Sequence, residues 1–339
     1  MQAHPSERRR AAVIGSGSWG TALALVAARA RHDVRMWARE PEVADSITRS
    51  RRNPFYLSEF ELPENISATT SLELALEGAD LVITVVPSHA MREVLRQMRP
   101  YLRAETVIVS ATKGVENGSL MRMSEVAHSV LGEIFEPRFV ALSGPSFAHE
   151  VAKGDPTAIV AASREREWCE MVQKELSSHV FRVYTNSDVA GVELGGAVKN
   201  VVAIGAGVVR GLGLGTNTVA AIITRGLAEM TRLALSEGAR PETLSGLAGL
   251  GDLVLTCTGE LSRNRKVGVE LGRGRALSDI LGEMREVAEG VNTTRAIHDL
   301  GRRLGIDMPI TGSIYALLYE DKSAIDAANE LMGRPLRRE

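Results

Sequence analysis

The chain has 339 residues, of which 44% are hydrophobic and 24% are charged. That length exceeds one ordinary hydrophobic core, so we expect two domains. The formal net charge of -2 shows none of the excess positive charge that is typical of nucleic-acid-binding proteins. Cys169 and Cys257 lie far apart in the sequence and form no CxxC pair. This excludes a disulfide framework and indicates a reduced, cytoplasmic setting.

The first elements in chain order are a strand, a glycine-rich turn, a helix and a second strand. Residues 10–20 read RAAVIGSGSWG, and the apolar helical pattern TALALVAARA and the strand-like run DVRMWAR follow. In this context GxGxxG predicts a dinucleotide site, although a purely structural glycine turn is the alternative. Gly15 permits the tight turn, Gly17 lets backbone amides approach a pyrophosphate, and Gly20 lets the helix pack closely. The helix N-terminus then favours the phosphates.

The end of the second strand indicates which nicotinamide cofactor binds. An acidic residue that holds the ribose 2′-hydroxyl is usual there in NAD-binding folds. This sequence has Arg39 followed by Glu40. An arginine suits a 2′-phosphate, so we favour NADPH, with NADH kept open by Glu40. The alternative is that Arg39 is a solvated surface residue.

Three apolar, strand-like runs follow, each ending in a polar loop. They are LVITVVPSHA at 81–90, TVIVSATKG at 106–114 and FVALSGPSFAHE at 139–150. Ligands of doubly wound sheets bind at the carboxyl ends of such strands. Lys113 is therefore a candidate ligand for a phosphate or a carbonyl, or else a solvated loop lysine.

The second half of the chain is dominated by helical periodicity. The expected helices span 189–209, 216–237, 276–288, 293–304 and 311–319. We therefore predict an α/β fold in which an N-terminal, Rossmann-type doubly wound sheet precedes an all-α C-terminal domain. The expected limits are 1–188 for the dinucleotide-binding domain and 189–339 for a helical domain that binds substrate.

The stretch GVELGGAVKNVVAIGAG contains Lys199 and Asn200 within an otherwise apolar helix. Charged residues at the centre of a bilayer are costly, so we favour a buried core helix over a membrane span. A buried ammonium is costly without partners, which makes Lys199 a candidate proton donor. We expect burial to lower its pKa and Asp252 to hold it. The seven histidines have no metal-ligand spacing, so we predict no metal site.

A second polar group lies in GLAGLGDLVLTCTGELSRNRKVG, residues 246–268. The sequence predicts a glycine-rich apolar loop that carries Asp252 and Thr256, followed by the polar run 262–265. Arginine in that run matches phosphate oxygens. Glu289 precedes Gly290 and is either a helix-terminal acid or a cofactor contact.

Together these residues resemble the bacterial-type NAD(P)-dependent glycerol-3-phosphate dehydrogenase family. The resemblance covers most of the chain, and the block GGAVKN followed by AGLGDLVLTCT is highly specific to the family. The matching motifs are GSGSWG (15–20), VVPSHA (85–90), ATKG (111–114), SGPSFA (143–148), GGAVKN (195–200), ITRGLAEM (223–230), AGLGDLVLTCT (248–258), SRNR (262–265) and MPI (308–310).

The resemblance implies reversible reduction of dihydroxyacetone phosphate to sn-glycerol 3-phosphate by NADPH or NADH, which supplies glycerophospholipid synthesis. It implies Lys199 as the general acid/base, with Lys113 and Asp252 as further catalytic residues. The implied substrate contacts are Lys113, Gly144, Ser146, Lys199, Asn200, Asp252, Ser262, Arg263 and Asn264. The implied cofactor contacts are Gly15, Gly17, Ser18, Trp19, Gly20, Arg39, Lys113, Ala148, Arg263, Val287 and Glu289.

Two other functions remain open at this point. The same architecture suits another two-domain, lysine-dependent reductase or β-hydroxyacid dehydrogenase. A non-catalytic NADP-binding sensor is the third possibility. We also expect a homodimer, because a helical domain with several apolar faces favours association, and no integral membrane association.

Overall fold

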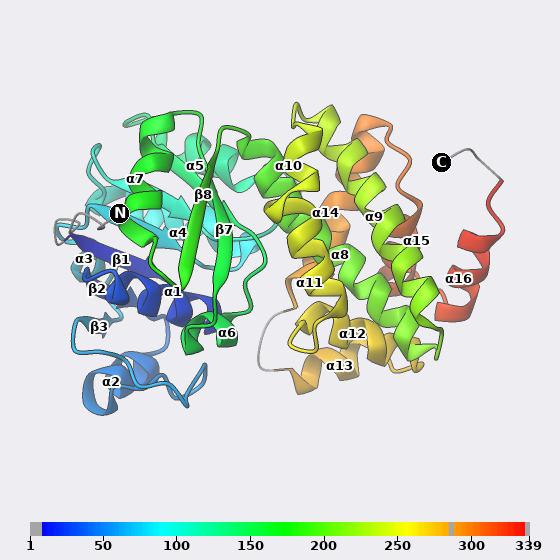
Figure 1. Ribbon diagram of the computed structural model, residues 1–339, viewed down its shortest axis with the longest axis horizontal. Helices are drawn as coiled ribbons and strands as arrows, with labels where there is room; N and C mark the ends of the chain where they lie inside the picture. The colour runs from blue at the N-terminus through cyan, green and yellow to red at the C-terminus, as the bar shows by residue number, and fades with distance from the viewer. Residues whose placement is uncertain (1–8, 285–287, 336–339) are drawn as a thin grey trace. The chain divides into compact units, whose positions relative to one another are not determined.

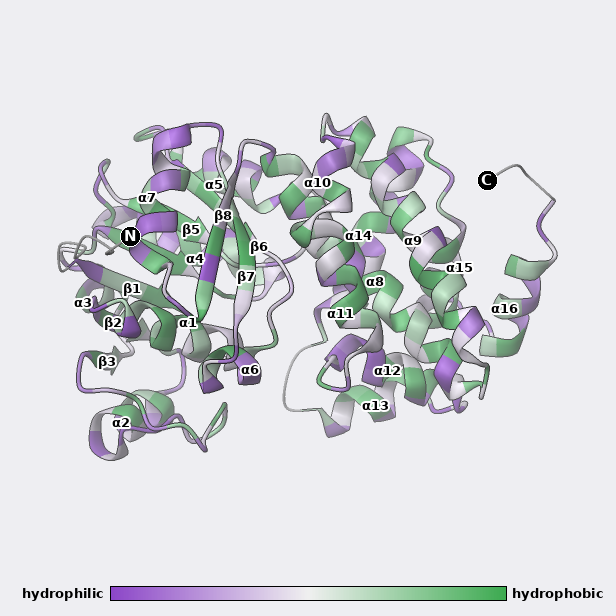
Figure 2. Ribbon diagram, in the orientation of Figure 1, coloured by the Kyte–Doolittle hydropathy of each residue, from purple (hydrophilic) through white to green (hydrophobic). Residues whose placement is uncertain are grey.

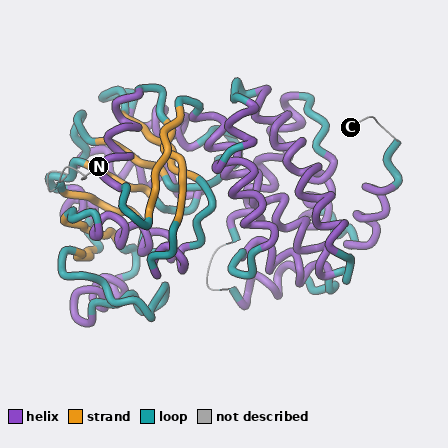
Figure 3. The backbone as a smooth tube through the Cα atoms, in the orientation of Figure 1, coloured by secondary structure: helices purple, strands orange, loops and turns teal. Residues whose placement is uncertain are grey.

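The computed structural model describes residues 9–284 and 288–335. The described residues divide into two compact units. The nucleotide unit comprises the described parts of 1–113 and 123–192, and the helical unit comprises those of 114–122 and 193–339. Strands gather in the nucleotide unit and helices dominate the helical unit (Figure 3).

The nucleotide unit is built on an eight-stranded sheet of described residues, in the order β3-β2-β1-β4-β5-β6-β7-β8. Neighbouring strands are parallel except β6 and β7, which pair antiparallel. The strands are β1 (Arg10–Ile14), β2 (Asp33–Trp37), β3 (Ile66–Thr69), β4 (Leu81–Thr84), β5 (Val107–Ser110), β6 (Arg138–Ser143), β7 (Thr157–Ala162) and β8 (Phe181–Asn186).

Helices lie on both faces of this sheet (Figure 1). They are α1 (Ser18–Arg29), α2 (Pro41–Ser50), α3 (Leu72–Leu76), α4 (Met91–Met98), α5 (Met123–Leu131), α6 (Ala148–Lys153) and α7 (Arg166–Leu176), with the short turns η1 (Ser88–Ala90) and η2 (Arg99–Tyr101). On one face α1 contacts α6 and α7, and on the other α4 contacts α3 and α5. The four residues of β4 are all buried, as expected for a strand covered on both sides.

The strand order reverses between β1 and β4, because the chain passes from β1 outward to β2 and β3 before it returns to β4. In open parallel sheets such a switch point is where ligands bind. The glycine-rich turn follows β1 at this point. The predicted fold class, a Rossmann-type doubly wound sheet followed by helices, is confirmed.

The helical unit is organised around one long helix, α8. Its elements are α8 (Val189–Gly211), α9 (Thr216–Ser236), α10 (Pro241–Ser245), η3 (Leu247–Gly251), α11 (Asp252–Thr258), α12 (Arg263–Gly272), α13 (Leu277–Glu283), α14 (Glu289–Leu304), α15 (Pro309–Tyr319) and α16 (Ala324–Met332). Among the described residues α8 is long and apolar enough to cross a membrane, yet its apolar window is wholly buried within the protein. Figure 2 shows it mostly in the hydrophobic colour, as is typical of a core helix.

The expectation of a glycine-rich loop that carries Asp252 and Thr256 within 246–268 was wrong. The segment forms the π-helical turn η3 and the helices α11 and α12. Glycine density suggested a loop, but Gly249 and Gly268 serve close packing. A Cβ on Gly249 would lie 2.0 Å from the Leu244 carbonyl oxygen, so only glycine lets this turn close. The helix expected over 276–288 ends at Glu283.

Glycines also allow α8 and α12 to touch through their backbones. A Cβ on Gly207 would lie 2.1 Å from the Arg265 carbonyl oxygen, and one on Gly268 would lie 2.0 Å from that of Ile204. Neither contact leaves room for a side chain. The glycines that lower the hydrophobicity of α8 therefore allow the polar start of α12 to lie close to the backbone of α8.

The segment 114–122 belongs to the helical unit although it precedes α5 in the chain. The Nη1 of Arg122 donates a hydrogen bond of 3.1 Å to the Glu193 carboxylate, and the two side chains are only 11% and 5% exposed. The predicted domain limits of 1–188 and 189–339 did not anticipate this segment and stay a prediction.

Candidate active site

The turn after β1 has the geometry that the three glycines predict. Gly15 has a φ of +118°, which favours glycine, and a Cβ there would lie 2.7 Å from the Val85 carbonyl oxygen. A Cβ on Gly20 would lie 2.0 Å from the Gly15 carbonyl oxygen, so the helix packs directly on the turn. A Cβ on Gly17 would meet no atom within 4 Å. The turn is therefore closely packed at Gly15 and Gly20 and open at Gly17, as a pyrophosphate site requires.

The other predicted cofactor residues of this turn begin α1 and precede α2. Ser18 is the first residue of α1, and Trp19 packs partly buried against the core. Arg39 is 83% exposed and donates hydrogen bonds of 2.9 and 2.6 Å to the Glu40 carboxylate. A 2′-phosphate would therefore compete with Glu40 for this guanidinium.

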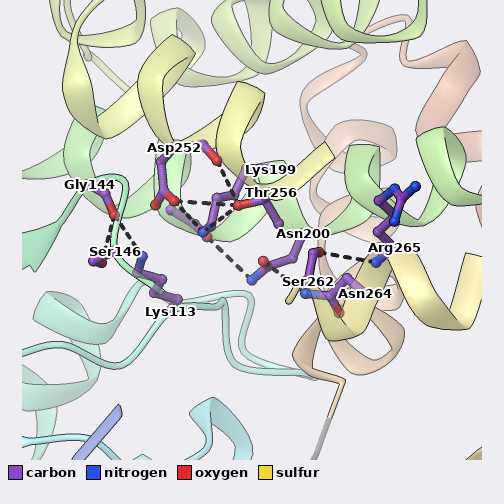
Figure 4. A network of polar contacts seen from close by, with 11 residues as sticks. Lys113, Gly144, Ser146, Lys199, Asn200, Asp252, Thr256, Ser262, Asn264 and Arg265 are labelled. Carbon is purple, nitrogen blue, oxygen red and sulfur yellow. Dashed lines mark hydrogen bonds and ion pairs between the residues drawn. The ribbon is translucent and has the colours of Figure 1, made fainter. Parts of the chain in front are cut away.

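A second cluster in the nucleotide unit joins the loops after β5 and β6. The Lys113 amine donates to the Gly144 carbonyl oxygen at 3.3 Å, and the Ser146 hydroxyl donates to the same oxygen at 2.9 Å (Figure 4). Gly144 has a φ of +140°, and a Cβ there would lie 2.9 Å from the Cα of Ile159. Ala148 begins α6 just beyond this loop. The structure thus brings together Lys113, Gly144 and Ser146.

Lys199 lies within the helical unit, held by two partners from α11. Its amine donates to Asp252 Oδ1 at 2.5 Å and to Thr256 Oγ1 at 2.9 Å (Figure 4). The three residues are only 6%, 1% and 4% exposed, respectively. Thr256 in turn donates to the Asp252 carbonyl oxygen at 2.6 Å. A buried ammonium paired with a carboxylate is a group that can donate a proton from a fixed position.

A close contact between α8 and η3 sets this geometry. A Cβ on Gly195, one turn before Lys199, would lie 2.5 Å from the Ala248 carbonyl oxygen. Glycine therefore allows α8 to approach the π-helical turn that immediately precedes Asp252. π-Helical turns occur frequently at functional sites. Thr256 had no predicted role, although its i,i+4 spacing from Asp252 places both residues on one helix face.

The predicted phosphate-binding residues meet α8 through a buried amide network. The Asn264 Nδ2 donates to Asn200 Oδ1 at 3.0 Å, and the Gly290 N–H donates to Asn264 Oδ1 at 2.9 Å. Ser262 caps α12, since its Oγ accepts from the Arg265 N–H at 3.2 Å (Figure 4). The structure thus links Asn200 and Asn264 and gives Ser262 a capping contact, with Arg263 as the first residue of α12.

The two remaining cofactor predictions fall around the start of α14. Glu289 is the first residue of α14. Val287 lies outside the described residues.

Cys257 lies beside the lysine and the aspartate but is not a nucleophile. Burial raises the pKa of its thiol to about 12. The thiolate, which is the reactive form, is therefore scarce at neutral pH. Among the described residues, no group of three or more His, Cys, Asp or Glu side chains is arranged to hold a metal ion.

A glycine cradle at the switch point of a doubly wound sheet, together with a buried lysine–aspartate pair, defines a nicotinamide-dependent oxidoreductase. Comparison with known proteins gives the family. The family models for the NAD-dependent glycerol-3-phosphate dehydrogenase N-terminus and C-terminus match residues 10–169 and 188–329. The chain belongs to this family.

Relatives match the chain over nearly its whole length. It is 57% identical over 328 residues to glycerol-3-phosphate dehydrogenase [NAD(P)+] of Koribacter versatilis, covering 96% of this chain and 97% of the relative. It is 54% identical to that of Geobacter sulfurreducens, covering 97% and 98%. The crystal structure of glycerol-3-phosphate dehydrogenase from Coxiella burnetii has a TM-score of 0.93 and 42% identity, covering 96% and 99%. The predicted family, oxidoreductase class and use of NADH or NADPH are confirmed.

Proposed function

We propose that this protein reduces dihydroxyacetone phosphate to sn-glycerol 3-phosphate with NADH or NADPH, reversibly, and that Lys199 donates the proton. Full-length similarity to enzymes named for glycerol 3-phosphate supports the reaction. The observation that carries the role of Lys199 is its amine, buried and held by Asp252 and Thr256. It is the proton donor that ketone reduction requires.

The residues around the first glycine turn fit a dinucleotide. The open space in front of Gly17 leaves room for a pyrophosphate, and the amides at the start of α1 point their positive dipole end there. Arg39 would hold a 2′-phosphate after exchange with Glu40, and on this basis we favour NADPH over NADH. The bound nicotinamide supplies the hydride. Ser18, Trp19, Ala148, Val287 and Glu289 are proposed as further cofactor contacts, on the resemblance of their motifs.

Lys199 completes the reduction by giving one proton to the carbonyl oxygen as that carbon gains a hydride. The proton leaves the Nζ, the new O–H bond forms, and the amine is left neutral until solvent restores its proton. Asp252 favours the charged amine before transfer, and Thr256 fixes its direction. Proton donation of this kind contributes about 10²- to 10⁴-fold. In the reverse reaction the neutral amine accepts the same proton.

The phosphate and hydroxyl groups of the substrate need donors. Arg263 offers a fork that matches phosphate oxygens, and Lys113 offers a compact positive charge. The amides of Asn200 and Asn264 are held by each other and by Gly290, so they present fixed polar edges. We propose all four, with Ser262 and the loop of Gly144 and Ser146, as substrate contacts.

The wider setting follows from the reaction and the composition. We propose a cytoplasmic homodimer whose product supplies glycerophospholipid synthesis. Two distant, buried, free cysteines fit a reducing compartment. The domain limits 1–188 and 189–339 are proposed with the nucleotide site in the first and Lys199 in the second.

The test combines an assay with a variant of the proton donor. Purified protein should oxidise NADPH and NADH when given dihydroxyacetone phosphate. Lys199→Met should lower turnover by about 10²- to 10⁴-fold while NADPH affinity, measured by fluorescence titration, stays within about twofold. Because the substitution removes the ammonium partner of Asp252, the double variant with Asp252→Asn serves as the folding control.

Three outcomes would contradict parts of the proposal. Turnover only with 2-oxo carboxylates would favour another lysine-dependent reductase. NADPH binding with no turnover of any substrate would favour a sensor. Normal turnover by Lys199→Met would remove the assigned proton donor and leave the reaction itself standing.

A further inference from the structure

A buried polar cluster behind the glycine turn is centred on Asn53, which lies outside every recognised motif. Asn53 is 0% exposed, as is Thr21, and Ser16 is 6% exposed. The Asn53 Nδ2 donates to the Ser16 carbonyl oxygen at 2.8 Å and to Thr21 Oγ1 at 2.9 Å. Ser16 belongs to the turn and Thr21 to the first turn of α1. The Asn53 side chain, 37 residues after Ser16, therefore holds the turn and the start of α1 through two hydrogen bonds.

The oxygen of the same amide is also used. Asn53 Oδ1 accepts from the Phe55 and Tyr56 N–H groups at 3.2 Å each. This local pattern is the one by which asparagine fixes a turn in its own backbone. The Asn53 side chain is thus anchored on its own segment and reaches out with both amide hydrogens. A fully bonded buried amide of this kind specifies a unique geometry.

The hydrogen bond from Asn53 to the Ser16 carbonyl fixes the direction of the Gly17 N–H. A peptide group is planar and trans, so the Ser16 carbonyl and the Gly17 N–H point in opposite directions. Holding the carbonyl toward Asn53 therefore turns the Gly17 N–H toward the opposite side of the peptide plane. Gly17 is the N-cap of α1, with φ -68° and ψ -178°, and a Cβ there would meet no atom within 4 Å. Glycine alone would not hold this orientation, because its backbone is the least restricted.

We propose that Asn53 is a positioning residue for the cofactor pyrophosphate. It orients the Gly17 amide before the cofactor arrives, so that binding does not have to order this peptide group. The inference rests on the proposed cofactor site at the glycine turn. It adds a determinant that lies outside GSGSWG, and it concerns the pyrophosphate rather than the adenosine or the nicotinamide.

The experiment compares Asn53→Ala with Asn65→Ala in the full chain. Asn65 is a matched control, because its Nδ2 donates to the Ala28 and His32 carbonyl oxygens at the other end of α1. Calorimetric titration of each folded variant would use NADPH, ADP-ribose and adenosine, of which only adenosine lacks a phosphate. Asn53→Ala should weaken NADPH and ADP-ribose by the same factor, about tenfold, and leave adenosine within about twofold. Asn65→Ala should change none of the three.

A second variant separates the two ends of the amide. Asn53→Asp keeps an acceptor for the Phe55 and Tyr56 amides but loses the donors to Ser16 and Thr21. It should weaken ADP-ribose at least as much as Asn53→Ala. Amide hydrogen exchange without cofactor supplies a readout independent of binding, and the Gly17 amide should exchange faster in both variants.

Several results would overturn the inference. They are unchanged ADP-ribose affinity in Asn53→Ala, equal weakening of adenosine, or failure of both variants to fold, which would assign Asn53 to stability alone. Each of these leaves the proposed function intact if the unsubstituted protein binds NADPH and reduces dihydroxyacetone phosphate. Failure of the unsubstituted protein to bind NADPH would instead remove the proposed cofactor site.

Discussion

The nucleotide unit and the helical unit place their chemical groups by different means. In the nucleotide unit the candidate groups lie on loops after strands, and many are backbone amides and carbonyls, as at Gly17 and Gly144. In the helical unit they are side chains on helices, buried and bonded to one another, as Lys199 and Asp252 are. One site is built from peptide groups and the other from packed helices.

The difference predicts how each site responds to substitution. Backbone groups survive most side-chain changes, so variants of the nucleotide unit should alter affinity for one part of a ligand at a time. Side chains on packed helices move with the helix, so a packing change should alter turnover even where no reacting group is touched. Substitutions in each unit test this contrast, and the largest effect is expected at Gly195.

Gly195→Ala should move the proton donor without altering it. The added Cβ would lie 2.5 Å from the Ala248 carbonyl oxygen, so α8 and η3 must separate. We expect a loss of about 1–3 kcal/mol in the free energy of unfolding. Turnover should fall on the order of 10²-fold while NADPH affinity is unchanged. Urea denaturation and steady-state kinetics measure the two effects.

Gly312→Ala is the matched control for this packing change. Gly312 also lies in a helix of the helical unit, α15, but a Cβ there would meet no atom within 4 Å. It should be neutral or stabilising by about 0.5–1 kcal/mol, with normal turnover. Equal losses of turnover in both variants would show that helix packing at Gly195 does not control the site.

Glu229 gives the helical unit a dependence on pH. Its buried carboxylate accepts from the Ile310 and Thr311 N–H groups at 2.6 and 3.2 Å, at the start of α15. Burial nevertheless raises the pKa of this carboxyl from 4.5 to about 6. The folded state therefore holds the proton more tightly than the unfolded state does. Stability from this group is greatest below about pH 4.5 and falls by about 2 kcal/mol as the pH rises through about 6.

Glu229→Gln should remove that part of the pH profile. Urea denaturation between pH 4.5 and 7 would give the difference between the variant and the unsubstituted protein at each pH. Glu260→Gln, at an exposed turn, is the control and should leave the profile unchanged. A difference between Glu229→Gln and the unsubstituted protein that does not vary with pH would contradict the prediction.

Arg39→Ala is the smallest expected effect and the most selective. Arg39 is exposed and its guanidinium is paired with Glu40, so its ion pair with a 2′-phosphate would be weakened by solvent screening. NADPH affinity should fall about fivefold, and NADH affinity should stay within about twofold. Glu40→Gln should tighten NADPH slightly, because it removes the competing carboxylate. Equal losses for both cofactors would contradict the 2′-phosphate assignment, and Arg49→Ala on the exposed face of α2 serves as the control.

Local sequence patterns were enough to predict the fold class and the dinucleotide turn. Each glycine of GSGSWG has a short-range reason, such as the positive φ of Gly15 or the contact between Gly20 and the turn. A lysine within an apolar helix was equally visible as a residue in need of partners. The glycine turn depends on residues that are neighbours in the chain, and the lysine is recognised because it is a charged residue in an apolar stretch. Both features can be read from the sequence.

Contacts across long separations were not predictable. The bond from Asn53 to Ser16 crosses 37 positions, and an Asn-Pro pair alone indicates only a turn. The glycines between 246 and 251 suggested a loop, because nothing in the sequence shows that the Leu244 carbonyl crowds Gly249 or that the Ala248 carbonyl crowds Gly195 of α8. Helices that are stabilised mainly by tertiary packing lack the local sequence signals from which a helix is predicted.

The pair of Arg122 and Glu193 has a consequence for exchanging parts between related enzymes. A hybrid that took residues 189–339 of this protein and everything before them from another would inherit the Glu193 carboxylate but not necessarily its guanidinium. Separating the partners of a buried ion pair costs about 3–5 kcal/mol. The transferable module is therefore discontinuous, and a swap that respects it must carry the short segment 114–122 along with the helices.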